Sequence, residues 1–172
     1  MNNLDVYDKL RPTIQTGDLI EWAGTDLLDK AIRLKTGYDV NHSSMVVLDN
    51  DLTGLIVRDY EALADGIDSM PLSIELATSS GHVYYYPLLP EFSSLEQRTE
   101  YNRIALRYER TPYDYISIAK ILFLGHRKIE EGKLFCSEFV EICHGAKDGD
   151  TAYYPGELPE KMKHWGQRIQ LY

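Results

Sequence analysis

The sequence has few cysteines, no long apolar run and no apolar segment near its start. Its 172 residues include two cysteines, Cys136 and Cys143, which would lie two turns apart on one helix and too far apart to bridge. We therefore expect no disulfide framework and a reducing compartment. No run approaches the roughly 18 apolar residues of a membrane span, and residues 1–13 lack the apolar core of a secretion signal. These absences predict a cytoplasmic protein with no integral membrane segment.

Basic residues are also fewer than acidic residues. The chain has 18 Lys and Arg against 27 Asp and Glu, a net charge of -9, which disfavours binding to nucleic acid or to an anionic membrane. Hydrophobic residues make up 44% and charged residues 26%, as in ordinary globular proteins. A chain of this length can bury a core by itself, so we expect a single domain over residues 1–172 with an N-terminal arm at 1–15.

Zinc ligation is not expected either. Cys136, Cys143 and His144 offer neither the C-x₂₋₄-C spacing nor the four ligands of a structural zinc site. We expect no metal ion and no other cofactor. His126 and His144, which flank the helix expected to carry both cysteines, are expected to be solvated.

Alternating strand and helix patterns run along the chain. Short apolar runs rich in β-branched and aromatic residues predict strands, and spacings of three and four predict helices. Ser94 is a candidate N-cap. The expected elements are a strand at 19–22, a helix at 27–34, hairpin strands at 41–48 and 55–62, a loop at 66–72, a strand at 82–88, a helix at 93–108 and an apolar segment at 116–124.

The hairpin carries a histidine and two carboxylates. If its turn is centred between residues 51 and 52, His42 faces Glu61 and Ser44 faces Asp59. Directly opposed residues project from the same face with Cβ atoms about 5 Å apart. A slip of two residues would give Asp59 the place of Glu61, and a slip of one would send both side chains to the other face. Glu61 is the preferred partner of His42.

Cys136 lies at the start of a strongly apolar helix. Phe135, Phe139, Val140 and Cys143 recur on one helical face, which places Cys136 in the first turn. Unpaired backbone N–H groups and the positive end of the helix dipole favour a thiolate there. A lone cysteine on an apolar helix is more commonly a small buried hydrophobe, and that alternative stays open from this segment alone.

Together, Cys136, His42 and Glu61 are the parts of a cysteine nucleophile triad. The thiolate would attack a carbonyl, His42 would protonate the leaving group, and Glu61 would hold the imidazole in the required tautomer. The chain order is His, Glu, Cys, whereas papain-like enzymes normally place the cysteine first. Chain order does not decide the geometry of such a site.

A family resemblance follows from these motifs in combination. The chain resembles the circularly permuted papain-like amidases of the YiiX/YaeF group, within the NlpC-type superfamily and related to the lecithin:retinol acyltransferase-like proteins. The resemblance spans roughly residues 14–143. The segments that carry it are Thr16-Gly17-Asp18-Leu19-Ile20, Asn41-His42-Ser43-Ser44-Met45-Val46-Val47, Tyr60-Glu61-Ala62, Pro112-Tyr113-Asp114 and Phe135-Cys136-Ser137-Glu138-Phe139-Val140.

The resemblance implies an α+β, papain-like (permuted NlpC-type) fold, with an antiparallel sheet packed against helices that include the nucleophile helix. It also implies Cys136 as nucleophile, His42 as general base and acid, Glu61 as third member, and Tyr113 as a residue that helps the oxyanion site beside the nucleophile. Tyr113 as ordinary packing is an equal alternative. Export signals of secreted relatives and hydrophobic anchors of lipid-acting relatives are absent from this sequence.

The expected function is a cysteine-dependent hydrolase or acyltransferase that acts on a small peptide, amide or acyl substrate through a thioester. The alternative from a different class is a catalytically idle papain-like module that binds a peptide or acyl ligand. Alkylation separates the two, because an activated Cys136 reacts well below pH 8 while Cys143 stays inert.

Overall fold

The computed structural model describes residues 4–52, 54–63, 66–114, 134–147 and 153–172. Its centre is a six-stranded sheet in the order β4-β3-β2-β1-β5-β6, in which every neighbouring pair is antiparallel. The strands are β1 (Leu19–Ala23), β2 (His42–Asp51), β3 (Gly54–Leu63), β4 (Gly66–Pro71), β5 (His82–Tyr86) and β6 (Ile169–Gln170).

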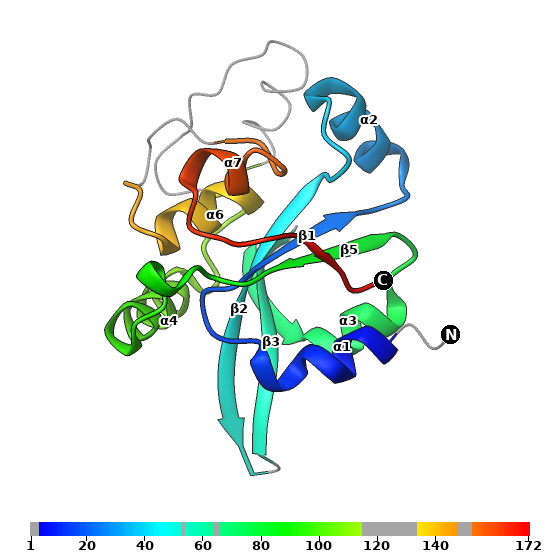
Figure 1. Ribbon diagram of the computed structural model, residues 1–172. Coiled ribbons are helices and arrows are strands. Elements are labelled where there is room, and N and C mark those ends of the chain that lie inside the picture. Colours follow the sequence, from blue (N-terminus) through cyan, green and yellow to red (C-terminus); the bar gives the residue numbers. More distant parts are fainter. Residues whose placement is uncertain (1–3, 53, 64–65, 115–133, 148–152) are drawn as a thin grey trace.

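Helices cover both faces of the sheet (Figure 1). On one face lie α4, α6 and α7, and on the other lie α1 and α3. The expected class, an antiparallel sheet packed against helices, is thereby confirmed. The helices are α1 (Asp5–Leu10), α2 (Leu27–Thr36), α3 (Leu72–Thr78), α4 (Leu95–Tyr108), α6 (Cys136–Cys143) and α7 (Leu158–Met162), with single 3₁₀ turns η1 (Arg11–Thr13) and η2 (Pro90–Phe92).

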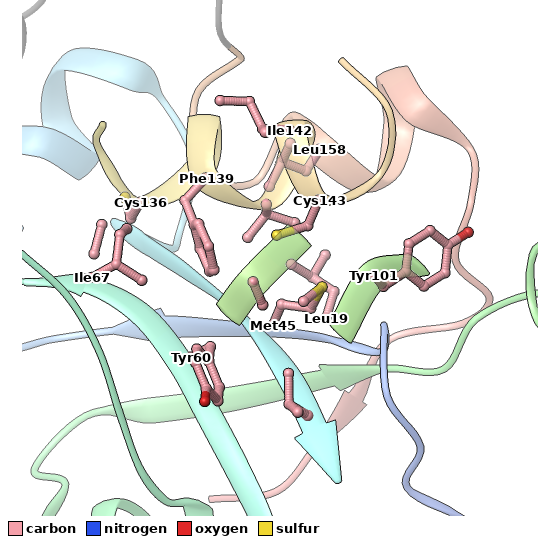
Figure 2. Packing of buried hydrophobic residues seen from close by; sticks show 14 of the residues in the cluster. Leu19, Met45, Tyr60, Ile67, Tyr101, Cys136, Phe139, Ile142, Cys143 and Leu158 are labelled. Carbon is pink, nitrogen blue, oxygen red and sulfur yellow. The ribbon is translucent and has the colours of Figure 1, made fainter. Parts of the chain in front are cut away.

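The two sheet faces bury separate cores because successive strand residues point to opposite sides. On β2, Met45 packs into the core beneath α6 and Val46 into the core beneath α1 and α3. Figure 2 shows Phe139 extending from α6 toward the sheet, and Tyr60 of β3 belongs to the same core. Fully buried Phe139 thereby anchors α6 to the sheet.

The hairpin forms as expected, but its register differs. Asp51 pairs with Gly54 and Met45 with Tyr60, a shift of two residues from the expected pairing. The strands close at Gly54, whose φ of +125° is a conformation that glycine adopts without steric cost. A two-residue shift leaves every side chain on its original face. His42 and Glu61 therefore share a face as diagonal neighbours, and our expectation that they are directly opposed is wrong.

The segment expected to be a loop at 66–72 is instead the edge strand β4, which pairs with β3 from Gly66 to Pro71. Ile67 is buried by this pairing, and Pro71, which has no backbone N–H, stands at the end of the strand. The short polar sequence hid the strand because an edge strand buries few side chains.

Other expected elements hold. The strand at 19–22, the helix at 27–34, the strand at 82–88 and the helix at 93–108 correspond to β1, α2, β5 and α4. Ser94 caps α4, with the Gln97 N–H donating to its Oγ at 3.2 Å. The segment expected to be an N-terminal arm contains α1 and η1 and buries Tyr7 and Ile14. The apolar segment at 116–124 lies outside the described residues.

None of the helices that the structure describes has the length and apolarity needed to cross a membrane.

Candidate active site

Cys136 is the first residue of α6, as expected. Phe135 before it is extended, and its N–H donates to the Glu138 carboxylate at 3.4 Å, which caps the helix start. Every residue of α6 is buried, and Cys136 itself is 4% exposed. The N–H groups in the first turn of a helix have no partner within the helix. The sulfur of Cys136 therefore lies where backbone donors can stabilise a negative charge.

His42 lies between the thiol and a carboxylate. It begins β2, opposite Trp22 of β1. Its Nε2 is 2.7 Å from Oε2 of Glu61, and its ring lies close enough to Cys136 to interact with the thiol. Because Nε2 is engaged by Glu61, Nδ1 is the ring nitrogen left for the thiol. The structure thus brings together the three side chains that the sequence analysis grouped.

Electrostatic interactions among Cys136, His42 and Glu61 favour the ionised forms of these side chains. Burial alone would lower the pKa of His42, but the negative charges and hydrogen bonds of Cys136 and Glu61 raise it well above its ordinary value. Burial would likewise raise the pKa of Cys136. The interaction of the thiol with His42, together with the backbone N–H groups of Ser43 and Ser137, outweighs burial, and the pKa of Cys136 is lowered. The arrangement favours a thiolate beside an imidazolium.

Asp59, the alternative partner of His42, is committed elsewhere. Ser44 Oγ donates to its Oδ2 at 2.7 Å, and Trp22 Nε1 donates to Ser44 Oγ at 2.9 Å. Asp59 is fully buried by this network. The carboxylate that contacts His42 is therefore Glu61.

Tyr113 lies beside the segment that leads into α6. Its backbone forms a parallel bridge with Leu134, and the Asp114 N–H donates to the Leu134 carbonyl at 3.0 Å. The Tyr113 side chain is half-buried against the core that contains Cys136. This placement is compatible with both readings of Tyr113, packing and assistance to the oxyanion site.

A third carboxylate joins Asp59 and Glu61. Glu75, on α3, offers a carboxylate oxygen that lies within 4.8 Å of one from each of the other two. Burial and the neighbouring carboxylates raise the pKa of Asp59 to about 7 and that of Glu75 to about 12. Sequence reasoning missed Glu75 because the segment before it was read as a loop, without α3. The signal that could have located Glu75 is the short run Leu72-Ser73-Ile74-Glu75-Leu76, in which Glu75 stands one turn into a helix.

A cavity of about 380 Å³ opens beside the carboxylates. Glu61 and Glu75 line it, together with Trp22 of β1 and Asp26 and Asp29 at the start of α2. It gives access from the surface to Glu61, the carboxylate that contacts His42.

The remaining cysteine and its neighbour are structural. Cys143 is 1% exposed, and burial alone raises the pKa of its thiol. His144 is 8% exposed and packs against Tyr101 and Trp165, and burial lowers its pKa to about 3. The expectation that His144 is solvated is wrong, since α6 ends against α4 and the C-terminal segment. His126 lies outside the described residues.

Comparison with solved structures relates this geometry to a known protein. The chain is similar to the metalloprotein YiiX from Escherichia coli O157:H7. The two are 26% identical with a TM-score of 0.60, over 76% of this chain and 64% of YiiX. The chain thus spans less than two thirds of YiiX. No family model and no curated protein matches the sequence. The similarity supports the YiiX part of the sequence resemblance.

Proposed function

We propose that the chain is a cysteine-dependent hydrolase that cleaves an amide or ester bond through a thioester intermediate. The observation that carries this proposal is the position of the His42 ring, whose Nε2 lies 2.7 Å from the Glu61 carboxylate and whose interaction with Cys136 lowers the pKa of that thiol. A cysteine nucleophile needs an adjacent base, and the base needs a group that orients it. The chain supplies both in one contiguous set.

In the proposed reaction, His42 accepts the thiol proton and the Cys136 thiolate attacks the substrate carbonyl carbon. The resulting oxyanion is stabilised by the Cys136 N–H at the start of α6, and we assign the Tyr113 hydroxyl as a second donor. When the tetrahedral intermediate collapses, the C–N or C–O bond breaks and the His42 imidazolium protonates the leaving amine or alcohol. The acyl group remains on Cys136 as a thioester.

Hydrolysis of the thioester completes the cycle. Neutral His42 takes a proton from a water molecule, whose oxygen attacks the thioester carbonyl. The C–S bond then breaks, and the acid product leaves while the thiolate and the imidazolium are restored. Glu61 holds the His42 ring through Nε2 in every step and stabilises its charged form. Replacement of water by another nucleophile would make the same site an acyltransferase.

The proposed fold and substrate class follow from the same features. We propose a permuted papain-like, NlpC-type fold, in which the α6 start meets the strand that carries His42. The proposed substrates are small peptides, amides or acyl compounds. YiiX is described as a metalloprotein. The cysteine chemistry proposed for this chain passes no step through a metal ion.

Acylation of Cys136 tests the proposal. The protein is incubated with p-nitrophenyl acetate and with a panel of peptide amides, and the adduct is located by peptide mass spectrometry. We expect an acetyl group on Cys136 that disappears with time as water releases it. Cys136→Ala should abolish the adduct and His42→Ala should slow its formation, while the matched variant Cys143→Ala should behave as wild type.

Absence of an adduct on Cys136, or acylation at the same rate in His42→Ala, would contradict the hydrolase. Such a result would favour the module that binds a peptide or acyl ligand without turnover.

A further inference from the structure

Three carboxylates from different elements converge beside the proposed catalytic group. Asp59 and Glu61 project from the same face of β3, and Glu75 reaches them from α3, which packs over that face. One oxygen from each lies within 4.8 Å of one from each of the others. Carboxylates this close repel one another when ionised, unless a cation or a proton lies between them.

Within the described residues, the charge of the three carboxylates is offset by one histidine and by the proton that the raised pKa of Glu75 keeps on the cluster. The one cationic side chain paired with the group is His42, which takes a single oxygen of Glu61. Asp59 is 0% exposed, and among the described residues its Oδ1 has no hydrogen-bond donor other than the proton on Glu75. Glu75 Oε2 is likewise buried without a donor. A fully buried carboxylate oxygen without a partner is costly, and this independent observation indicates a missing ligand.

The spacing of the oxygens fits a metal ion. Ligand oxygens on opposite sides of Ca²⁺ are about 4.6–5.2 Å apart and those around Mg²⁺ about 4.2 Å apart, twice the metal–oxygen distance. The three carboxylate oxygens all lie within 4.8 Å of one another, close enough for one such ion to contact all three. Purely oxygen donors select hard cations over zinc or copper.

The cavity supplies a route of entry and room for water ligands. Glu61 and Glu75 line its 380 Å³, while Asp59 lies fully buried. Asp26 and Asp29 line the same cavity and add negative charge. A cation entering there would keep several waters, as Mg²⁺ and Ca²⁺ commonly do.

We propose that Asp59, Glu61 and Glu75 bind one hard divalent cation of the Mg²⁺, Mn²⁺ or Ca²⁺ class. The site uses one carboxylate oxygen each from Asp59, Glu61 and Glu75. This inference does not rest on the proposed hydrolase activity, and binding can be measured without turnover.

The test uses the full chain, freed of metal with EDTA and dialysed. Mn²⁺ is titrated into the protein at neutral pH, and free Mn²⁺ is followed by electron paramagnetic resonance. Mg²⁺ and Ca²⁺ are then added as competitors. We expect one saturable Mn²⁺ site per chain and a higher melting temperature when it is filled.

Charge-removing variants locate the site. Asp59→Asn and Glu75→Gln should each weaken Mn²⁺ binding by roughly tenfold or more, as loss of a metal partner does. Glu96→Gln, the same change at an exposed position on α4, should bind as wild type. Glu75 is only half-buried, so its variant keeps the test valid if Asp59→Asn does not fold.

Several outcomes would overturn the proposal. These are no saturable Mn²⁺ site, equal binding in wild type and in both cluster variants, or stabilisation by n-butylammonium with none by any divalent ion. The last would assign the cluster to an organic ammonium group instead.

Discussion

Removal of His42 should suppress the reactivity of Cys136 at acidic pH. His42 is the principal group that lowers the pKa of this buried thiol, and burial acts in the opposite direction. In His42→Ala the thiol loses its cationic partner but stays buried. A free thiol of pKa about 8.5 is only about 0.3% ionised at pH 6, so the thiolate population should fall by about 300-fold, and by more because burial raises the pKa further.

Part of that loss is offset by nucleophilicity. A thiolate of higher pKa attacks faster, with a Brønsted coefficient of about 0.4–0.5. Each unit by which the pKa rises therefore lowers the thiolate population about tenfold but raises the rate constant of the remaining thiolate about threefold. The rate of Cys136 alkylation at pH 6 should therefore fall by at least about tenfold in His42→Ala.

The assay is iodoacetamide labelling between pH 5.5 and 9 in the presence of EDTA, read by peptide mass spectrometry. Buried Cys143, whose pKa is raised, serves as an internal control and should stay unlabelled in the folded protein. His82→Ala, the same change at an exposed histidine of β5, should label as wild type. Circular dichroism checks that each variant is folded.

A wild-type Cys136 that titrates like a free thiol would refute the reasoning. So would equal labelling of Cys136 at pH 6 in wild type and His42→Ala. Equal, slow labelling of both cysteines would favour the binding module.

Three further predictions concern the same structure. Glu61→Gln should lower the pKa of His42 by about one to two units, because a hydrogen bond to a charged group contributes about 1.5–3 kcal/mol and one unit corresponds to 1.36 kcal/mol; an unchanged ¹⁵N titration of His42 with EDTA present would contradict this. Glu21 is fully buried, and desolvation raises its pKa to about 7, so the folded state holds its proton longer than the unfolded state and stability should fall between about pH 4.5 and pH 7. Glu21→Gln should flatten that slope in urea unfolding, and an identical slope would exclude this origin. Phe139→Ala should destabilise the protein by about 3–5 kcal/mol, as for a fully buried aromatic; a cost no larger than that of Phe92→Ala, at a half-buried site, would show that α6 is not anchored as described.

Two features of the chain explain why much of the fold could be predicted. The β-branched runs of β1, β2, β3 and β5 and the apolar spacing of α4 and α6 are strong local signals, and their elements form where expected. The edge strand β4 and helix α3 carry weak local signals. Their stability comes from pairing with β3 and from burial of residues such as Ile67 and Leu76, and neither is visible in a short window.

The contact of His42 with Glu61 was predicted through a register that is wrong by two residues. The prediction survived because strand side chains alternate with a period of two, so an even shift preserves the face and a diagonal pair stays within reach. A shift of one residue would have separated the two side chains. The alternation of side chains along the strands thus fixed the sheet face on which His42 and Glu61 lie, and the closure of the hairpin at Gly54 decided the register.

By itself, the sequence determined which chemistry-bearing residues stand at element starts and on which strand face, because both follow from local periodicity. Cys136 at the first turn of α6 and His42 on the face of Glu61 belong to this class. Only the tertiary structure decided that β2 places both His42 and the backbone N–H of Ser43 beside the Cys136 thiol. It also decided that Glu75 completes a group with Asp59 and Glu61. These contacts join elements far apart in the chain, and they arise from the packing of α6 and α3 on opposite faces of one sheet.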